Sequence, residues 1–393
     1  MEHHTLIRLH IKKHYLIFFL FMTSFVLAGQ PARKLKILYV VDAFPKLTET
    51  FIAENIVGMI EKGHDISVYA RKRVTNKKVH PVVTEYKLLD RTYFGSLPPD
   101  LQEYDIILCQ FGHLGYLFPK KRLSKKTKLV TCIRGSDITQ NIEKKIKKYN
   151  QLFLEGDLFL PVCHYFKRIL RRLSCSEEKI MVNGSPINCE AFPYQERHWQ
   201  PGQTLEIISI GRLVAKKGRR TLIRAVEILS QKYPVHLTIV GNGTEKENLL
   251  AFVKRLNVEE KVTFIFTANQ TEIRKLLERA HIFILTSETA RDGNEEGIPN
   301  AFKEAMASGN IVIGTYHAAI PELIFHQKTG LLVKQKNPFA VVKAIEWILN
   351  NKDKWLQITK AARLYVEKNF DRHVLATELE SILLKIVENK RIL

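Results

Sequence analysis

The sequence has few cysteines, and none of them forms a pattern that binds metal or crosslinks a small domain. There are five in 393 residues, an odd number, and no two are spaced as Cys-x-x-Cys. This count and spacing exclude a disulfide framework and a common type of zinc site. Most of the five lie in or beside apolar runs, so we expect buried free thiols in a reducing compartment.

Acidic residues are also scarce relative to basic ones. The 61 Lys and Arg outnumber the 40 Asp and Glu, which gives a formal net charge of +21 and predicts an anionic partner. The alternative explanation for each basic run is a solvated helix face or loop with no partner. Nucleic-acid modules add aromatic platforms or a recognised motif, and we find neither, so we expect no nucleic acid and favour an anionic membrane surface. The basic runs all lie in the first half, at residues 71–78, 120–128, 144–148 and 167–172.

The apolar run at residues 15–28 is short for a membrane-spanning helix. Lysines precede it and small residues follow it, as in a secretory signal peptide. Three interpretations stay open for residues 1–34: a cleaved signal, a monotopic anchor, or an upstream extension from a wrong start, with Met22 as a later start. We favour the anchor or the wrong start, because the chemistry inferred below uses a cytoplasmic donor.

Short-period repeats and low-complexity tracts are absent, and apolar strands alternate with helical stretches from residue 36 onward. Such near-continuous apolar strands are typical of parallel sheets covered on both faces. The polar segment 194–203 separates two series and is expected to be a linker. We therefore predict an α/β fold with two doubly wound Rossmann-like domains facing a cleft. The expected strands are residues 36–41, 65–70, 105–109, 128–133 and 157–162, then 206–211, 235–241, 262–266, 282–287 and 311–315.

Two predicted helices have recognisable ends. The helix near residues 48–63 has Thr48 as a candidate cap and Gly63 as a stop signal. The helix near residues 299–308 has Pro299 in its first turn and Gly309 just beyond its end. Helical patterns also continue from residue 337 to the end of the chain.

Charged residues follow the strands of the second series. Arg212 and Lys217 flank a short loop that opens a helix, which suits a diphosphate; the structural alternative is an ion-paired arginine and solvated lysines. Before the helix at 299–308, Gly297 and Ile298 are expected to present free backbone N–H groups to an anion.

Two glutamates frame that same helix. Glu304 lies more than a turn inside it, where a carboxylate can accept two hydrogen bonds from a vicinal diol such as a ribose. Glu296 stands just before the helix, where its charge also favours the N-terminal dipole. The plain alternatives are solvation for Glu304 and the dipole role for Glu296. In the first half, His113, Arg134 and Asp137 come just after strands, and His113 between glycines is a candidate site residue.

Together these stretches resemble the retaining GT-B glycosyltransferases of family 4, also called group 1. The resemblance runs from about residue 36 to the C-terminus, and its first half looks most like transferases of bacterial exopolysaccharide assembly, of the colanic-acid and amylovoran type. The segments that carry it are "GRLVAKKG", "VGNGTEKENL", "EGIPNAFKE" continued by "AMASGNIVIGT", "IPELIFHQKTGLLV", "DAFPKLTETFIAEN" and "FGHLG". The chain departs from the family pattern at "DAFPKLTET" and at Arg134-Gly135, where many members have His-Gly; both stretches border the acceptor pocket.

The resemblance implies a role for each site residue. Arg212 and Lys217, chosen over Lys216, hold the donor diphosphate, and the amides of Gly297 and Ile298 meet its β-phosphate. It also implies that Glu304 binds the nucleotide ribose, that Glu296 faces the donor sugar near its anomeric carbon, and that His113 contacts the transferring sugar from the acceptor side. No metal and no cofactor beyond the nucleotide-sugar co-substrate are expected, and no Asp-x-Asp motif ends a strand.

The expected function is transfer of a sugar from a nucleotide-sugar to a saccharide or lipid-linked acceptor, in the cytoplasm at the inner face of the plasma membrane. The alternative is a non-catalytic sugar-nucleotide or polysaccharide-binding protein on the same scaffold. The expected parts are an N-terminal segment (1–34), an acceptor-binding domain (35–200), a nucleotide-sugar-binding domain (201–370) and a C-terminal helix (371–393) that packs back on the first domain.

Overall fold

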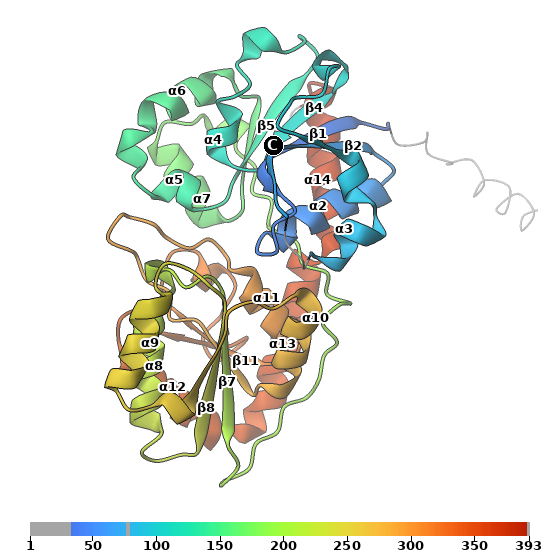
Figure 1. Ribbon diagram of the computed structural model, residues 1–393. Helices are drawn as coiled ribbons and strands as arrows, with labels where there is room; N and C mark the ends of the chain where they lie inside the picture. The colour runs from blue at the N-terminus through green and yellow to red at the C-terminus, as the bar shows by residue number, and fades with distance from the viewer. Residues whose placement is uncertain (1–32, 76–78, 391–393) are drawn as a thin grey trace, which may run out of the picture. The chain divides into compact units, whose positions relative to one another are not determined.

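Two parallel β-sheets organise the part of the chain that the structure, a computed structural model, describes: residues 33–75 and 79–390 (Figure 1). The segment interpreted above as an anchor, signal or wrong start lies outside these residues, apart from its last two positions. Within the described part, no helix is long and apolar enough to cross a bilayer.

The first sheet has the strand order β3-β2-β1-β4-β5-β6, and every neighbouring pair is parallel. Its strands are β1 (Lys36–Phe44), β2 (Asp65–Arg73), β3 (Thr92–Phe94), β4 (Ile106–Cys109), β5 (Lys128–Ile133) and β6 (Leu158–Pro161). The order reverses beside β1, as in doubly wound sheets.

The second sheet repeats this plan, with the order β12-β11-β10-β7-β8-β9 and parallel pairing throughout. Its strands are β7 (Leu205–Ile210), β8 (Val235–Val240), β9 (Val262–Ile265), β10 (Ile282–Ile284), β11 (Ile311–Thr315) and β12 (Leu331–Val333). Counted from its own first strand, each sheet therefore reads 3-2-1-4-5-6. The second reversal lies beside β7, so each sheet offers one ligand site at the carboxyl ends of its strands.

Helices connect the strands. The helices of the first series are α2 (Thr50–Glu61), α3 (Pro81–Glu85), α4 (Gly112–Gly115), α5 (Ser136–Thr139), α6 (Ile146–Glu155) and α7 (His164–Arg172). Those of the second are α8 (Arg219–Leu229), α9 (Lys246–Arg255), α10 (Gln270–Arg279), α11 (Asn300–Ala307), α12 (Pro338–Asn350), α13 (Trp355–Phe370) and α14 (Arg372–Val387).

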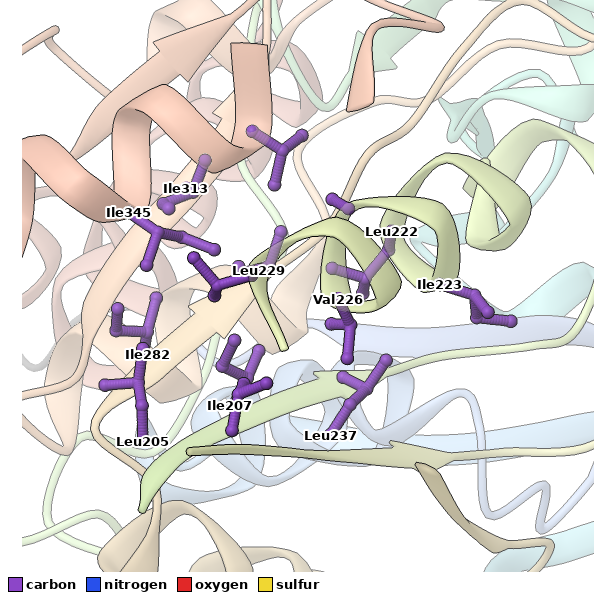
Figure 2. Close-up of a cluster of buried hydrophobic side chains, with 14 of the residues drawn as sticks. Leu205, Ile207, Leu222, Ile223, Val226, Leu229, Leu237, Ile282, Ile313 and Ile345 are labelled. Atoms are coloured by element: carbon purple, nitrogen blue, oxygen red, sulfur yellow. The ribbon is translucent and has the colours of Figure 1, made fainter. Parts of the chain in front are cut away.

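The core of the second sheet shows why its strands and helices form. Leu222, Val226 and Leu229 recur at helical spacing on α8 and pack on Ile207 and Leu237 of the strands (Figure 2). All five are at most 1% exposed, so each is a fully buried aliphatic side chain. Full burial of one such side chain contributes about 1.5–3 kcal/mol.

The last helix belongs to the core of the first sheet. α14 packs against α2, and its Leu379 and Leu383 lie in the same apolar cluster as Ile37 of β1. Arg372, at the start of α14, forms an ion pair with Glu54 of α2 at 2.9 Å. Apolar contact and a buried charge pair therefore both hold α14 to α2.

The strands expected from the sequence are all present, and the five cysteines are buried free thiols as predicted. The sequence did not indicate the edge strands β3 and β12, which are only three residues long. Thr48 is not the cap of α2. The N–H of Glu49 donates to the carbonyl of Lys46 in a preceding turn, so the helix begins at Thr50 with Glu49 at its N-cap.

The expected linker, residues 194–203, contains neither helix nor strand, but it is packed. Arg197 donates to the carbonyls of Leu277 and Ser308, and Trp199 is 7% exposed in the core of the second sheet. These contacts attach the segment to the second series of strands.

Candidate active site

A cavity of about 1090 Å³ lies within the compact unit Leu35–Leu393. Residues that follow β1, β4 and β5 of the first sheet and β7, β8 and β9 of the second line it. This volume is at the upper end of small-molecule sites, and the position matches the reversal of strand order in both sheets. All the site residues expected from the sequence line this cavity: His113, Arg212, Lys217, Glu296, Gly297, Ile298 and Glu304.

The segment before α11 leaves backbone N–H groups free at the cavity wall. Among the described residues, no protein group accepts from the N–H of Gly297 or of Ile298. A side chain at position 297 would place its Cβ 3.0 Å from Phe166, so the close packing here favours glycine. Free N–H groups at the start of a helix carry partial positive charge and bind anions.

Glu296 is a buried carboxylate between two lysines. Lys217 Nζ lies 2.9 Å from Glu296 Oε1 and Lys216 Nζ lies 3.7 Å from Oε2. Burial alone would raise the pKa of Glu296, but the two ammonium groups outweigh it and hold that pKa at about 2. Glu296 is therefore ionised at any ordinary pH. Its backbone N–H donates to His317 Nε2, whose ring has a pKa lowered by burial.

Lys216 is as much a part of this wall as Lys217. Both side chains are nearly buried, both line the cavity, and both contact Glu296. Lys216 also donates to the carbonyl of Glu295 at 2.8 Å. The expectation that Lys217 alone serves the diphosphate therefore stays a prediction.

Arg212 enters the same wall directly after β7. It is exposed, and among the described residues no carboxylate forms an ion pair with it. Neighbouring glycines keep the backbone close: Gly241 has φ 138°, and a Cβ there would overlap the carbonyl oxygen of Gly211. The loops after β7 and β8 thus pack tightly and leave Arg212 free to bind an anion.

Glu304 lies inside α11 and is 5% exposed at the cavity wall. Burial raises its pKa, and Gln270 Nε2 donates to its Oε1 at 3.2 Å. The neighbouring Lys303 is fully buried and donates to the carbonyl of Ser185. Burial lowers the pKa of Lys303 to about 7.

We call the first sheet with its helices the first lobe, and the second sheet with its helices the second lobe. On the first lobe, His113 forms a pair with a residue that the sequence analysis did not select. His113 Nε2 lies 2.6 Å from Asp42 Oδ2, and Arg71 Nη1 lies 3.3 Å from the other oxygen of Asp42. The hydrogen bond from His113 lowers the pKa of Asp42, and the ring of Phe111 stacks on His113. Asp42 lies near the end of β1 and His113 follows β4. Because these two strands are neighbours in the sheet, their pairing was the one signal that could have predicted this contact.

Arg134 and Asp137, both noted after β5, have different surroundings. The carboxylate of Asp137 accepts from the backbone N–H groups of Gly112, Arg134 and Gly135, so it fixes the loops. Arg134 instead lines the cavity, and its guanidinium lies over the ring of Phe51 at 4.5 Å. No sequence pattern indicated this orientation.

The segment that carries Glu296 also contacts the first lobe. Tyr165 donates to Glu295 Oε2 at 2.6 Å, and the N–H of Glu295 donates to Thr139 Oγ1 at 3.2 Å. Gln140 Nε2 donates to Asp292 Oδ2 at 2.6 Å. These bonds place the ionised Glu296 and the free amides beside the loop that follows β5.

Residues 194–365 match the family described as Glycosyl transferases group 1. The chain is 29% identical to the amylovoran biosynthesis glycosyltransferase AmsK of Erwinia amylovora, over 89% of this chain and 99% of that protein. It is 27% identical to the putative colanic acid biosynthesis glycosyltransferase WcaL of Escherichia coli, over the same shares of the two chains.

Among solved structures, the fold is similar to that of HepE of Anabaena in complex with UDP-glucose. The TM-score is 0.72 at 16% identity, over 90% of this chain and 100% of that chain. At this identity the likeness shows the fold alone. With the two parallel sheets, it confirms the predicted GT-B arrangement.

Proposed function

Because residues 194–365 match the family described as Glycosyl transferases group 1, we propose that the protein transfers a sugar from a nucleotide-sugar to a saccharide or lipid-linked acceptor, with retention of configuration at the anomeric carbon. One observation carries the proposal. Arg212, the lysine pair on Glu296 and the free amides of Gly297 and Ile298 line a single cavity with the carboxylate of Glu304.

The chemistry needs stabilisation of a leaving group. When the bond between sugar and phosphate breaks, negative charge develops on the nucleoside diphosphate. Arg212, Lys217 and the amides of Gly297 and Ile298 are donors that line the cavity, where they can stabilise this charge as it develops. In this proposal the diphosphate is held by these groups alone, without a metal ion.

The carboxylates have separate roles. Glu296 stays ionised because of Lys216 and Lys217, so it favours positive charge that develops at the anomeric carbon. Glu304 has two oxygens available to the ribose diol, one of which already accepts from Gln270. His113, held by Asp42, contacts the transferring sugar from the first lobe.

The names of the relatives support a role in exopolysaccharide synthesis, because AmsK and WcaL are named for amylovoran and colanic acid. The HepE complex with UDP-glucose supports a nucleotide-sugar donor, with UDP as the first nucleotide to test. We therefore propose a cell-surface polysaccharide as the product to which this transfer contributes.

A basic surface on the first lobe supports a membrane-bound acceptor. On α6, Lys147 and Lys148 are exposed, and Leu154 is 80% exposed on the same helix. A lysine-rich surface with an exposed leucine suits the inner face of a plasma membrane that contains anionic lipid. We expect the protein to sediment with phosphatidylglycerol vesicles at low salt but not with phosphatidylcholine vesicles. Charge reversal of Lys147 and Lys148 should weaken this binding, and reversal of the exposed Lys254 on α9 should not.

A panel of nucleotides and nucleotide-sugars tests the proposed activity. We expect UDP or GDP to raise the melting temperature, because a ligand that binds only the folded protein stabilises it. We further expect slow hydrolysis of the matching nucleotide-sugar, or transfer to extracted lipid. Binding without either reaction would favour the alternative, a non-catalytic sugar-nucleotide-binding protein. No stabilisation by any nucleotide would contradict the proposal.

A further inference from the structure

Arg134 is a charged group in the cavity that the proposed chemistry does not use. Its side chain is half-buried at the cavity wall, directly after β5. Among the described residues, no carboxylate forms an ion pair with it; its partners are neutral oxygens, an aromatic ring and the buried thiol of Cys132. Lys216 and Lys217, by contrast, share Glu296.

The guanidinium of Arg134 is held in one orientation. Its Nε donates to the carbonyl of Gln110 at 3.1 Å, one terminal nitrogen donates to the side-chain oxygen of Gln110, and the other donates to Ser185 Oγ at 2.9 Å. The plane lies over Phe51, with 4.5 Å from Cζ to the ring centroid. An arginine has five N–H donors, so two remain after these three bonds.

Ser185 adds a further donor at the same place. It lines the cavity, and its hydroxyl oxygen accepts from Arg134 while its carbonyl accepts from the buried ammonium of Lys303. An oxygen that accepts in this way leaves its own O–H free to donate. Spare donors from a fixed guanidinium and a hydroxyl match a planar carboxylate.

The position also fits the transferring sugar. Gly135, next to Arg134, is packed so that a Cβ there would lie 3.6 Å from the carbonyl oxygen of Glu295. The loop that carries Arg134 is therefore adjacent to the segment that carries Glu296. Under the proposed function the diphosphate binds to Arg212 and Lys217. Its negative charge is therefore balanced in the second lobe and does not need Arg134.

We propose that Arg134 and Ser185 form a subsite for a carboxylate on a sugar bound in the cavity, so that one of the two sugar substrates is a uronic acid or another carboxylated sugar. This inference rests on the proposed function and narrows it. The carboxylate belongs either to the transferring sugar or to the acceptor sugar. Both sources present the same chemistry to Arg134.

The experiment uses the full chain and matched ligand pairs. The donor arm measures binding of UDP-glucose against UDP-glucuronic acid and of UDP-galactose against UDP-galacturonic acid, or of GDP-mannose against GDP-mannuronic acid if GDP is the nucleotide that stabilises the protein. The acceptor arm measures binding of methyl glucoside against methyl glucuronide, and of methyl galactoside against methyl galacturonide, to protein saturated with that nucleotide.

We expect the wild type to bind the acidic member about 10- to 100-fold more tightly in one arm, the range for a hydrogen bond to a charged group. Arg134→Gln should lose this preference while it still binds the nucleotide, and Arg134→Lys should keep part of it. Lys145→Gln is the matched control. Lys145 also lines the cavity and donates to the carbonyl oxygens of Ser136 and Gln140, so it tests for a general effect of positive charge.

The arm that shows the preference identifies the sugar that carries the carboxylate. Equal binding of both members in both arms, or a preference that survives in Arg134→Gln or disappears in Lys145→Gln, would overturn the subsite. Nucleotide binding with no such preference leaves the proposed function intact and removes only this inference. A thermal melt of each variant without ligand shows whether the fold is retained.

Discussion

The two lobes have the same strand order but present different chemistry at the carboxyl ends of their strands. The second lobe places two lysines around an ionised glutamate and leaves the amides of Gly297 and Ile298 free. The first lobe presents the hydrogen-bonded pair of His113 and Asp42, together with Arg134, whose partners within residues 33–75 and 79–390 are neutral groups. The shared topology fixes where a ligand binds, and the local side chains decide what kind of ligand each wall accepts.

We expect the largest effect from a residue that joins the last helix to the first lobe. Arg372 of α14 pairs with Glu54 at 2.9 Å and with Glu61 at 3.2 Å, and its side chain is 8% exposed. Arg372→Ala leaves Glu54 buried without its partner, which should cost about 3–5 kcal/mol of unfolding free energy at pH 8. Urea denaturation measures this loss.

The same variant has a predicted pH dependence. Burial raises the pKa of Glu54 to about 7, although Arg372 opposes this, so the pKa should rise further without Arg372. A raised carboxyl pKa means that the folded state binds the proton more tightly, so stability falls as pH rises through that range. The loss in Arg372→Ala should therefore be smaller at pH 5 than at pH 8. An equal loss at both pH values would contradict a buried charge pair. So would a loss as small as that expected for Lys360→Ala, which breaks an exposed ion pair of α13 with Glu196.

The next effect concerns turnover in the second lobe. Lys217→Ala and Glu304→Ala should each lower donor turnover about 10²–10³-fold or abolish it, while the fold survives, because both side chains lie at the cavity wall. Hydrolysis or transfer of the matching nucleotide-sugar measures the loss. The exposed Lys254 and Glu260, each changed to Ala, are the controls. Activity close to wild type in either site variant refutes the role given to that residue.

Glu296→Gln should separate binding from chemistry. It keeps the shape of the side chain and removes the charge that Lys216 and Lys217 stabilise. We expect turnover to fall by about tenfold or more, because an electrostatic contribution to the transition state is lost, while the affinity for donor changes less. Titration calorimetry and steady-state rates measure the two quantities. A loss of affinity with turnover unchanged would place Glu296 in ground-state binding alone.

The smallest effect is expected in the first lobe. Asp42→Asn removes the charge that holds His113 and keeps a hydrogen-bonding side chain. Turnover should fall by no more than about tenfold, less than the 10²–10⁴-fold that a positioned general acid or base contributes, because His113 itself remains. If Asp42 positions His113, Asp42→Asn in a His113→Ala background should have little further effect. Full additivity of the two changes would show that Asp42 acts on its own.

The difference between the lobes also explains how much the sequence predicted. The strands were predictable because each is a near-continuous apolar run, whereas β3 and β12 are too short to give a pattern. Arg212 was predictable because it comes directly after a strand. Glu296 and Glu304 were predictable because one stands just before a helix and the other lies within it. All three line one cavity. Asp42 and His317 were missed, because their importance depends on which neighbouring strand end or loop their side chains meet.

The lysines and Arg134 show a second limit of the sequence. The resemblance to the family favoured Lys217 over Lys216, yet both ammonium groups contact Glu296. Both lysines lie in the short 3₁₀ turn Ala215–Lys217 that precedes α8. Arg134 was noted as a residue after a strand and as a departure from the His-Gly of many family members, but neither observation gave it a role. The structure shows that Gln110, Ser185 and Phe51, which are neutral, surround its guanidinium. The sequence could not show this, because these residues are far apart in the chain.

A crystal structure with UDP or GDP bound tests the central claim most directly. We predict that the β-phosphate lies about 3 Å from the amide nitrogens of Gly297 and Ile298 and within reach of Arg212, with the ribose hydroxyls hydrogen-bonded to Glu304. A nucleotide bound elsewhere in the chain, or in this cavity with its diphosphate turned away from Arg212 and α11, would contradict it.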